Sequence, residues 1–144
     1  MNTTVTGCKD PAFEGELRRA ANFFAKELLS RQMLPHIVLE IVMKTHLKDL
    51  GNCCITYYND WYQPREFEIE LRRHRSLKNT ILTLAHEMVH LKQFAKRELS
   101  EMNDIWKGQE INTETTCYFD LPWEIEACSY EHILYGLYKD STVS

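Results

Sequence analysis

Two histidines four residues apart, with a glutamate directly after the first, are the residues of this sequence best suited to chemistry. They are His86, Glu87 and His90, in the stretch TLAHEMVHLKQ over 83–93. Imidazole nitrogens are common zinc ligands, and a carboxylate beside a bound water can act as a general base. The alternative is an ordinary helix whose solvated face happens to carry two histidines.

Helix geometry favours the metal interpretation. At about 100° per residue, positions four apart lie about 40° apart on the helix surface, so His86 and His90 can reach one ion. Glu87 lies about 100° round the helix from His86, beside such an ion rather than on it. The histidines face away from the apolar residues, which are Leu77, Ile81, Leu84, Met88, Leu91 and Ala95. This pattern predicts a zinc site on the floor of a cleft, with Glu87 as the general base.

A catalytic zinc needs a third protein ligand and an open fourth position for water. The longer pattern HExxHxxGxxH is absent, because Gln93 and Lys96 stand at its glycine and last histidine positions. The third ligand must therefore come from farther along the chain. Gln93 itself lies on the histidine side, where it either orients a ligand or is a solvated glutamine.

The segment DLPWEIEACSYEHILYGLY, residues 120–138, supplies the candidate third ligand. On a helix, Glu126 lies among the apolar side chains, within about 80° of several of them. A carboxylate in a buried stripe is costly unless it is paired or binds a metal. We therefore expect Glu126 to be the ligand. A salt bridge from Glu126 to a buried Lys or Arg, or ligation by Glu124 or His132 on the wetter side, stays open as an alternative.

The elements that must position these residues follow the order helix, three strands, helix, loop, helix, which places the fold in the α+β class. Helical spacing and Pro35 delimit the first helix, β-branched runs mark the strands, and Ser76 is a plausible N-cap of the second helix. The expected ranges are a helix over 11–33, strands over 36–43, 53–58 and 65–71, a helix over 77–98, a loop over 99–121 and a helix over 122–138.

The third predicted strand, REFEIEL over 65–71, alternates between apolar and acidic residues. Its apolar side chains point one way and its glutamates the other, as in a strand with one buried and one wet face. This pattern suggests a position near a sheet edge. By analogy with other folds, such an edge can accept an extended peptide through strand addition.

Length and composition predict one domain over residues 1–144, with a core of its own. The chain is 44% hydrophobic and 26% charged, and its net charge of −4 argues against broad attraction to nucleic acid. No apolar run reaches the length of a membrane span, and the first residues lack the apolar stretch of a secretory signal. The five cysteines show no CxxC spacing, so we interpret them as reduced thiols in a cytoplasmic protein.

Several stretches resemble a known family. LAHEMVHLKQ resembles the active-site helix of small zincin metallopeptidases of the gluzincin type, above all compact SprT-like and phage-encoded zinc peptidases. IWKGQ, residues 105–109, and YFDLPWEIEA, residues 118–127, resemble the downstream block in which EIEA delivers the third ligand. The resemblance extends over roughly residues 50–138, and the first helix matches only in kind. It implies a minimal zincin-like domain, and the phage connection implies the cytoplasm of an infected host.

Carried over to this chain, the resemblance implies one Zn²⁺ held by His86, His90 and Glu126, with Glu87 as the general base. The activity implied is hydrolysis of a peptide or protein substrate by a zinc-activated water. The developing oxyanion then needs a second donor besides the metal. Tyr118 is our candidate for that donor, because it is an aromatic hydroxyl shortly before the ligand helix. Its alternative role is ordinary aromatic packing.

A second class of function depends on the basic stretch RRHRSLK, residues 72–78. This stretch either contacts phosphate groups or is a solvated connection between a strand and a helix. With phosphate contacts, the protein would be a protease that acts on DNA-bound proteins, or a DNA-associated or protein-binding module whose zinc is structural or regulatory. A structural zinc site would be closed by four protein ligands, whereas two histidines and a glutamate leave a position open. The sequence does not fix the oligomeric state.

Overall fold

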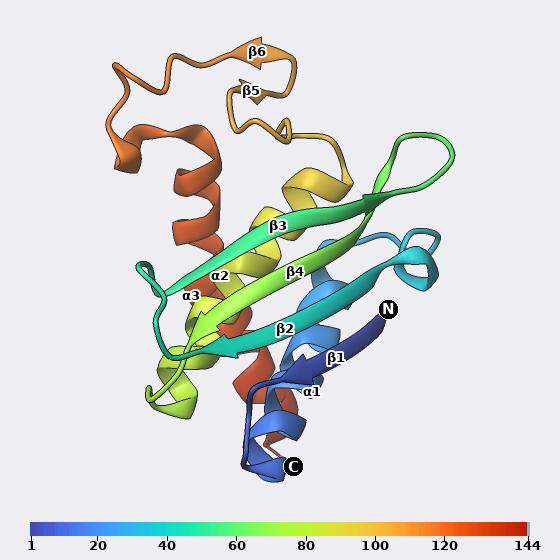
Figure 1. Ribbon diagram of the computed structural model, residues 1–144, viewed down its shortest axis with the longest axis vertical. Coiled ribbons are helices and arrows are strands. Elements are labelled where there is room, and N and C mark those ends of the chain that lie inside the picture. Colours follow the sequence, from blue (N-terminus) through green and yellow to red (C-terminus); the bar gives the residue numbers. More distant parts are fainter. Residues whose placement is uncertain (144) are drawn as a thin grey trace.

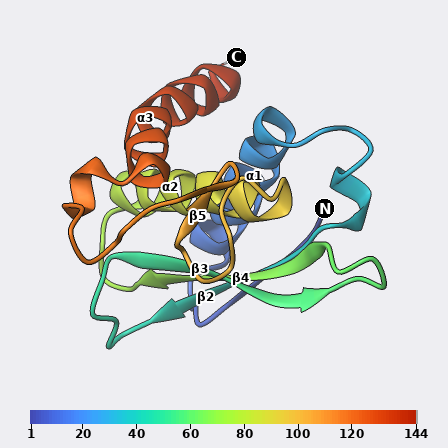
Figure 2. The ribbon, with the colours of Figure 1, turned by 90° about the horizontal axis from the view of Figure 1, so that it is seen from above.

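A mixed four-stranded sheet carries all three helices on one of its faces, as the computed structural model shows for residues 1–143 (Figures 1 and 2). The strands lie in the spatial order β1, β2, β4, β3. Pairing is parallel between β1 and β2 and between β2 and β4, and antiparallel between β4 and β3. The bounds are Asn2–Thr6 for β1, Val38–Lys44 for β2, Gly51–Tyr58 for β3 and Pro64–Arg72 for β4. The α+β class is confirmed.

The sheet has four strands and not the expected three, because β1 was not predicted from the sequence. This strand, NTTVT, has one buried apolar residue, Val5, and so lacks the alternation that marks a half-buried strand. It is specified by its pairing instead, with Asn2 opposite Val38 and Val5 opposite Ile41. An edge strand held by its neighbour in this way leaves little trace in the local sequence.

Strand β4 shows the predicted alternation, but it is not at an edge. Phe67, Ile69 and Leu71 are almost fully buried, while the three glutamates between and before them are partly exposed. Because β4 lies between β2 and β3, the edge strand nearest the histidines is β3. The expectation failed because alternation reports one wet face, which inner and edge strands of a one-sided sheet share.

All three helices begin at the residues predicted from the sequence, but their last residues differ from the predicted ones. Helix α1 (Pro11–Leu28) is capped by Asp10 and stops five residues before the expected end, where a turn and a short 3₁₀ segment, η1 (Leu34–His36), follow. Helix α2 (Leu77–Ala95) has the expected N-cap, since Ser76 Oγ accepts a hydrogen bond from Asn79 N at 3.2 Å. Helix α3 (Pro122–Thr142) begins at its proline as expected and runs four residues longer.

Figure 2 shows the layers edge-on: α1 and α2 cover the sheet, and α3 lies on top of α2. The core is therefore shared between the sheet and the inner faces of α1 and α2. At the far end of α3, Tyr138 packs on Phe23 of α1 with ring centroids 5.6 Å apart, and its hydroxyl donates to Glu16 at 2.6 Å. Helix α3 is thus fixed against both neighbours.

The connection from α2 to α3 contains a small hairpin of β5 (Ile105–Trp106) and β6 (Gln109–Glu110) and a 3₁₀ turn, η2 (Tyr118–Asp120). The hairpin projects beyond the end of the sheet (Figure 1). Its Trp106 contacts Trp123 at the start of α3, with ring centroids 6.4 Å apart. Among residues 1–143, no helix combines the length and apolar character that crossing a membrane requires.

Candidate metal centre

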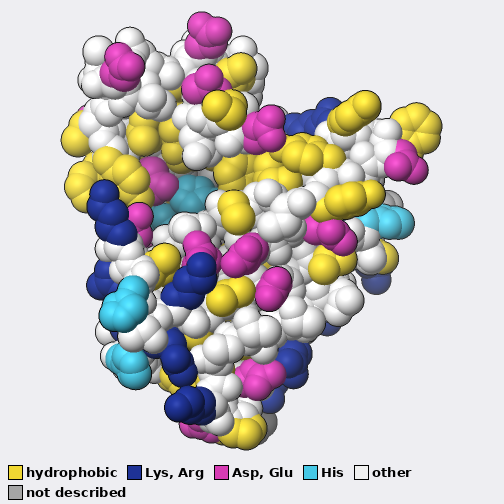
Figure 3. Space-filling model, viewed as in Figure 1, with side chains coloured by type: hydrophobic (Ala, Val, Ile, Leu, Met, Phe, Trp, Pro, Cys, Tyr) yellow, Lys and Arg dark blue, Asp and Glu magenta, His cyan; other side chains and the backbone are white. Residues whose placement is uncertain are grey.

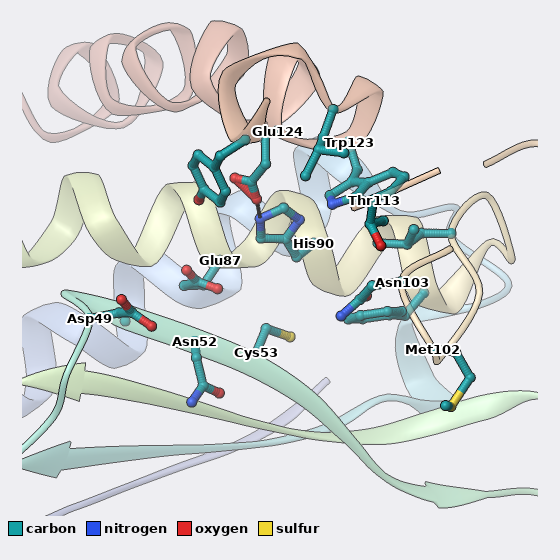
Figure 4. A pocket seen from close by; sticks show the side chains of 15 residues that line it. Asp49, Asn52, Cys53, Glu87, His90, Met102, Asn103, Thr113, Trp123 and Glu124 are labelled. Carbon is teal, nitrogen blue, oxygen red and sulfur yellow. Dashed lines mark ion pairs between the residues drawn. The ribbon is translucent and has the colours of Figure 1, made fainter. Parts of the chain in front are cut away.

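The two histidines of α2 face a carboxylate at the start of α3. His86 Nε2 lies 3.3 Å from Glu124 Oε2, and His90 Nε2 lies 2.7 Å from Glu124 Oε1. The imidazole rings are neighbours, with centroids 4.9 Å apart. One donor atom from each of these three side chains lies within 4.8 Å of the others, so the group could hold a metal ion. Figure 4 shows Glu124 pointing down from α3 onto His90.

Glu124, not Glu126, is therefore the carboxylate that meets the histidines, which corrects the expected ligand set. Glu126 instead forms an ion pair with Lys92, at 2.5 Å, and accepts a hydrogen bond from Gln93 Nε2 at 3.1 Å. The Glu124 side chain is 6% exposed, against 22% for Glu126. The salt-bridge alternative for Glu126, left open by the sequence, is the one that the structure has.

The error has a physical cause in the two faces of α3. Helical spacing groups Glu126 with Tyr130, Ile133 and Leu137, and such a stripe usually faces the core. In the structure that stripe faces outward, and Ile133 is 55% exposed. The buried face consists of Trp123, Glu124, Ala127, Leu134 and Tyr138. Glu124 lies on this buried face, beside Trp123 and Ala127.

Each histidine also forms a hydrogen bond through Nδ1, the ring nitrogen that does not face Glu124. His86 Nδ1 lies 3.1 Å from Glu131 Oε2, and His90 Nδ1 lies 2.7 Å from Gln93 Oε1. The amide of Gln93 is oriented by its own donation to Trp123 O at 3.0 Å, so its oxygen must accept from His90. Each Nδ1 therefore carries a proton, and each Nε2 presents a lone pair toward Glu124.

This arrangement needs a positive charge at its centre. In the neutral tautomer, two Nε2 lone pairs would face a carboxylate, which is repulsive unless a proton or a metal cation lies between them. Burial raises the pKa of the Glu124 carboxyl, but its contacts with the two histidines outweigh burial and hold the pKa far below its usual range. Burial lowers the pKa of each histidine, but the contact with Glu124 and the nearby carboxylate of Glu87 together outweigh burial and raise the pKa.

The donor set fits a divalent cation. Tetrahedral zinc with N and O ligands at about 2.0–2.2 Å keeps its ligand atoms about 3.3–3.5 Å apart. The 3.3 Å separation between His86 Nε2 and Glu124 Oε2 has this value, whereas the 2.7 Å between His90 Nε2 and Glu124 Oε1 is a hydrogen-bond distance. Glu124 Oε2 is also a buried oxygen without a hydrogen-bond partner among the described residues. A cation between the three side chains would satisfy it.

Glu87 lies beside this group and not in it. Its side chain points from α2 toward β3, with Asp49 on the far side of the cleft (Figure 4). It is only 6% exposed, and burial raises the pKa of its carboxyl. Glu87 lines both of the cavities that meet at the histidines, of about 460 and 550 Å³. A carboxylate in this position can accept a proton from a water bound at the centre.

The cleft runs between α2, β3 and the connection that leads to α3. One wall is the edge strand β3, through Gly51, Asn52 and Cys53, and the other includes Tyr118 of η2 and Leu121. Figure 3 shows the opening as a recess below the upper part of the molecule, with histidine and acidic side chains visible inside it. The cleft is therefore open to solvent and bordered by an unpaired strand edge.

Tyr118 lines both cavities together with Glu87. Burial and the contact of its hydroxyl with Glu124 raise the pKa of Tyr118 well above its usual range, so it is a neutral donor at any physiological pH. The residue as a whole remains half exposed. The structure thus brings Tyr118 to the site, while its action on an oxyanion stays a prediction.

The basic stretch 72–78 is largely occupied by contacts within the chain. Arg72 donates to Leu47 O at 2.9 Å, and Arg75 donates to Thr83 Oγ1 at 2.7 Å. These guanidinium groups fix the stretch to the connection between β2 and β3 and to α2. The structure therefore agrees with the interpretation of this stretch as a connection between strand and helix.

No protein-family model matches the chain, and neither the curated proteins nor the solved structures contain a match to it.

Proposed function

We propose that the chain is a zinc-dependent metallopeptidase of the small zincin type. The observation that carries the proposal is the convergence of His86, His90 and Glu124 beside the buried carboxylate of Glu87, at an open cleft. Three protein ligands leave a coordination position for water, as in catalytic zinc sites. The resemblance to SprT-like and phage-encoded peptidases, and the cytoplasmic location it implies, belong to this proposal.

The residues of the chain have distinct tasks in the reaction. When bound, zinc would lower the pKa of its water and polarise the substrate carbonyl. Glu87 takes the proton of that water and later returns it to the leaving amine. Tyr118 donates its hydroxyl hydrogen to the oxygen of the carbonyl under attack. Gln93 and Glu131 keep His90 and His86 in the tautomer that ligates through Nε2.

The substrate we propose is an extended peptide laid along β3. Within residues 1–143 this strand is paired on its β4 side alone, so its other edge offers backbone groups to the cleft. A peptide that pairs with an edge strand gains main-chain hydrogen bonds whatever its sequence. From the sequence, peptide binding by strand addition was expected at residues 65–71. Because that strand, β4, is interior, we now propose it for the edge strand β3.

The decisive experiment is Glu87→Gln. The amide keeps the shape but cannot accept the proton, so cleavage of a denatured protein mixture should fall by a factor on the order of 10²–10⁴. Zinc content and thermal stability should stay close to those of the wild type, because Glu87 does not ligate. Glu114→Gln, on the exposed connection to α3, is the matched control and should cleave normally. Equal cleavage by the Glu87→Gln variant and the wild type would remove Glu87 from the mechanism.

The alternative function, a DNA-associated or protein-binding module with a structural zinc, has less support. A structural site is closed by four protein ligands, and the group around Glu124 has three. The arginines Arg72 and Arg75 are engaged within the chain. DNA binding whose affinity falls steeply with salt, together with unchanged binding in Glu87→Gln, would favour this alternative.

A further inference from the structure

A second group of potential metal ligands lies beside the first one and shares a histidine with it. His86, Cys128 and Glu131 each offer one donor atom, and these three atoms lie within 4.8 Å of one another. Cys128 and Glu131 are three residues apart on α3, so their side chains emerge from the same side of the helix. The group therefore bridges α2 and α3, as the first one does.

Apart from the shared His86, the two groups have different ligands, and these line neighbouring cavities. Cys128 and Glu131 line the cavity of about 550 Å³ together with His86, whereas His90 and Glu124 line the neighbouring cavity of about 460 Å³. Glu131 meets His86 at Nδ1, on the opposite edge of the ring from the nitrogen that faces Glu124. An ion held by Cys128 and Glu131 is thus distinct from one held by His90 and Glu124.

We propose that Cys128 and Glu131, with His86 as third donor, form a second site for a soft divalent cation such as Zn²⁺, Cd²⁺ or Co²⁺. A thiolate selects this class of ion over Mg²⁺ or Ca²⁺, which prefer oxygen ligands. On binding, the Cys128 thiol releases its proton to solvent and a metal–sulfur bond forms. Glu131 exchanges its hydrogen bond from His86 for the cation, and the Nδ1 proton also passes to solvent when that nitrogen ligates.

Occupation of this site should inhibit the chemistry at its neighbour. Glu131 is the group that orients His86 for ligation through Nε2, and a cation on Glu131 removes that orientation. Loss of such a partner usually costs 10–100-fold in affinity or activity. The second cation also lies at the wall of the cleft, where it adds positive charge beside Glu87. Excess soft metal should therefore inhibit the protein, while excess Mg²⁺ should not.

The test is a Co²⁺ titration of the metal-free full chain, which does not require activity. A thiolate-to-cobalt charge-transfer band in the near ultraviolet reports ligation by sulfur. Wild type should bind two equivalents and develop this band, and Cys128→Ser should bind one equivalent without it. Cys117→Ser, which changes another exposed cysteine, is the matched control and should behave as wild type. His90→Ala should lose the first site and keep the band, so the two sites can fail separately.

A wild-type protein that binds one equivalent without the band would overturn the second site and leave the proposed function standing. The same result follows from a band that persists in Cys128→Ser, which would assign the sulfur to another cysteine. Circular dichroism of each variant establishes that it is folded. Where cleavage is measurable, excess Zn²⁺ should lower it roughly 10–100-fold in wild type and not in Cys128→Ser. Equal inhibition of both proteins would contradict the inhibitory role.

Discussion

At the scale of single residues, the site depends on which nitrogen of each imidazole is occupied. Gln93 and Glu131 hold the Nδ1 atoms of His90 and His86, so that both Nε2 atoms converge on Glu124. The group is preorganised before any ion binds, since the rings cannot turn without losing these contacts. Metal affinity should consequently depend on three ligating side chains and on two supporting ones.

The ligand assignment gives the first prediction at this scale. Glu124→Ala should lower zinc affinity at the group of His86 and His90 by orders of magnitude, because it removes the carboxylate that reaches both Nε2 atoms. Glu126→Ala is the matched control. It removes a partner of Lys92 and of Gln93, but the Gln93 amide remains oriented by Trp123 O, so zinc content should be unchanged. Equilibrium dialysis against a zinc buffer measures both. Loss of zinc in Glu126→Ala, with retention in Glu124→Ala, would restore the ligand expected from the sequence.

The second prediction at this scale concerns Gln93, which orients His90. Gln93→Leu keeps the volume of a fully buried side chain and removes its hydrogen bond with His90. Zinc affinity should fall about 10–100-fold, the usual effect of losing such a partner. Stability should also fall, by about 1–3 kcal/mol, because Trp123 O loses its buried donor. Competition with a chromophoric chelator measures the zinc affinity, and unfolding in denaturant measures the stability. Unchanged zinc affinity would mean that Gln93 does not orient His90.

The sequence predicted some of these residues for a definable reason. His86, Glu87 and His90 span about one turn of a helix, where geometry is fixed locally. Glu124 could not be distinguished from Glu126 in the same way, because that choice depends on which face of α3 meets α2. The exposed stripe of Tyr130, Ile133 and Leu137 is as apolar as the buried one. Gln93 was recognised as a possible positioning residue because it shares the histidine side.

At the scale of elements, the position of α3 determines which carboxylate meets the two histidines. Its N-terminal end brings Glu124 to α2, and its C-terminal half is fixed to α1 through Tyr138. The existence of α3 and its start at Pro122 followed from sequence. Its contacts with α1 and α2 are tertiary, as is the pairing that makes β1 a strand, so neither could be derived from local patterns.

Tyr138→Phe tests how firmly α3 is fixed. The change removes a hydrogen bond to the Glu16 carboxylate and should lower the free energy of unfolding by about 1.5–3 kcal/mol at neutral pH. The pKa of Glu16 is held below the ordinary carboxyl value of 4.5, first by Tyr138 and then by Arg19. A depressed pKa stabilises the fold above that value, and the contribution is lost as pH falls through the folded pKa.

The difference between Tyr138→Phe and wild type should therefore shrink as the pH falls below the ordinary carboxyl value of 4.5 and through the lowered pKa of Glu16. Urea unfolding at pH 7 and at pH 3 measures it. Tyr130→Phe, which removes a half-exposed hydroxyl on the outward face of the same helix, is the matched control and should change little at either pH. A deficit of equal size at both pH values would show that packing, and not the bond to Glu16, explains the effect.

At the scale of the whole molecule, a bound ion would link parts of the chain that the sheet does not connect. His86 and His90 belong to a helix packed on the sheet, and Glu124 belongs to a helix that packs mainly on α2. The long connection between them, with its small hairpin, forms the wall of the cleft. Metal binding and the stability of the outer layer are therefore coupled.

Zinc should raise the stability of the folded chain by an amount set by its affinity. A ligand that binds only the folded state adds about 2.7 kcal/mol at 100 times its Kd and about 4.1 kcal/mol at 1,000 times. We expect the melting temperature of metal-free protein to rise with added zinc in wild type and in Glu126→Ala, and to rise much less in Glu124→Ala, which keeps only the ligands of the second site. Hydrogen exchange should show the gain in α3 first, since Glu124 connects that helix to α2. A rise in melting temperature of equal size in Glu124→Ala would mean that zinc binds elsewhere, and equal protection gained throughout the sheet would contradict the local coupling.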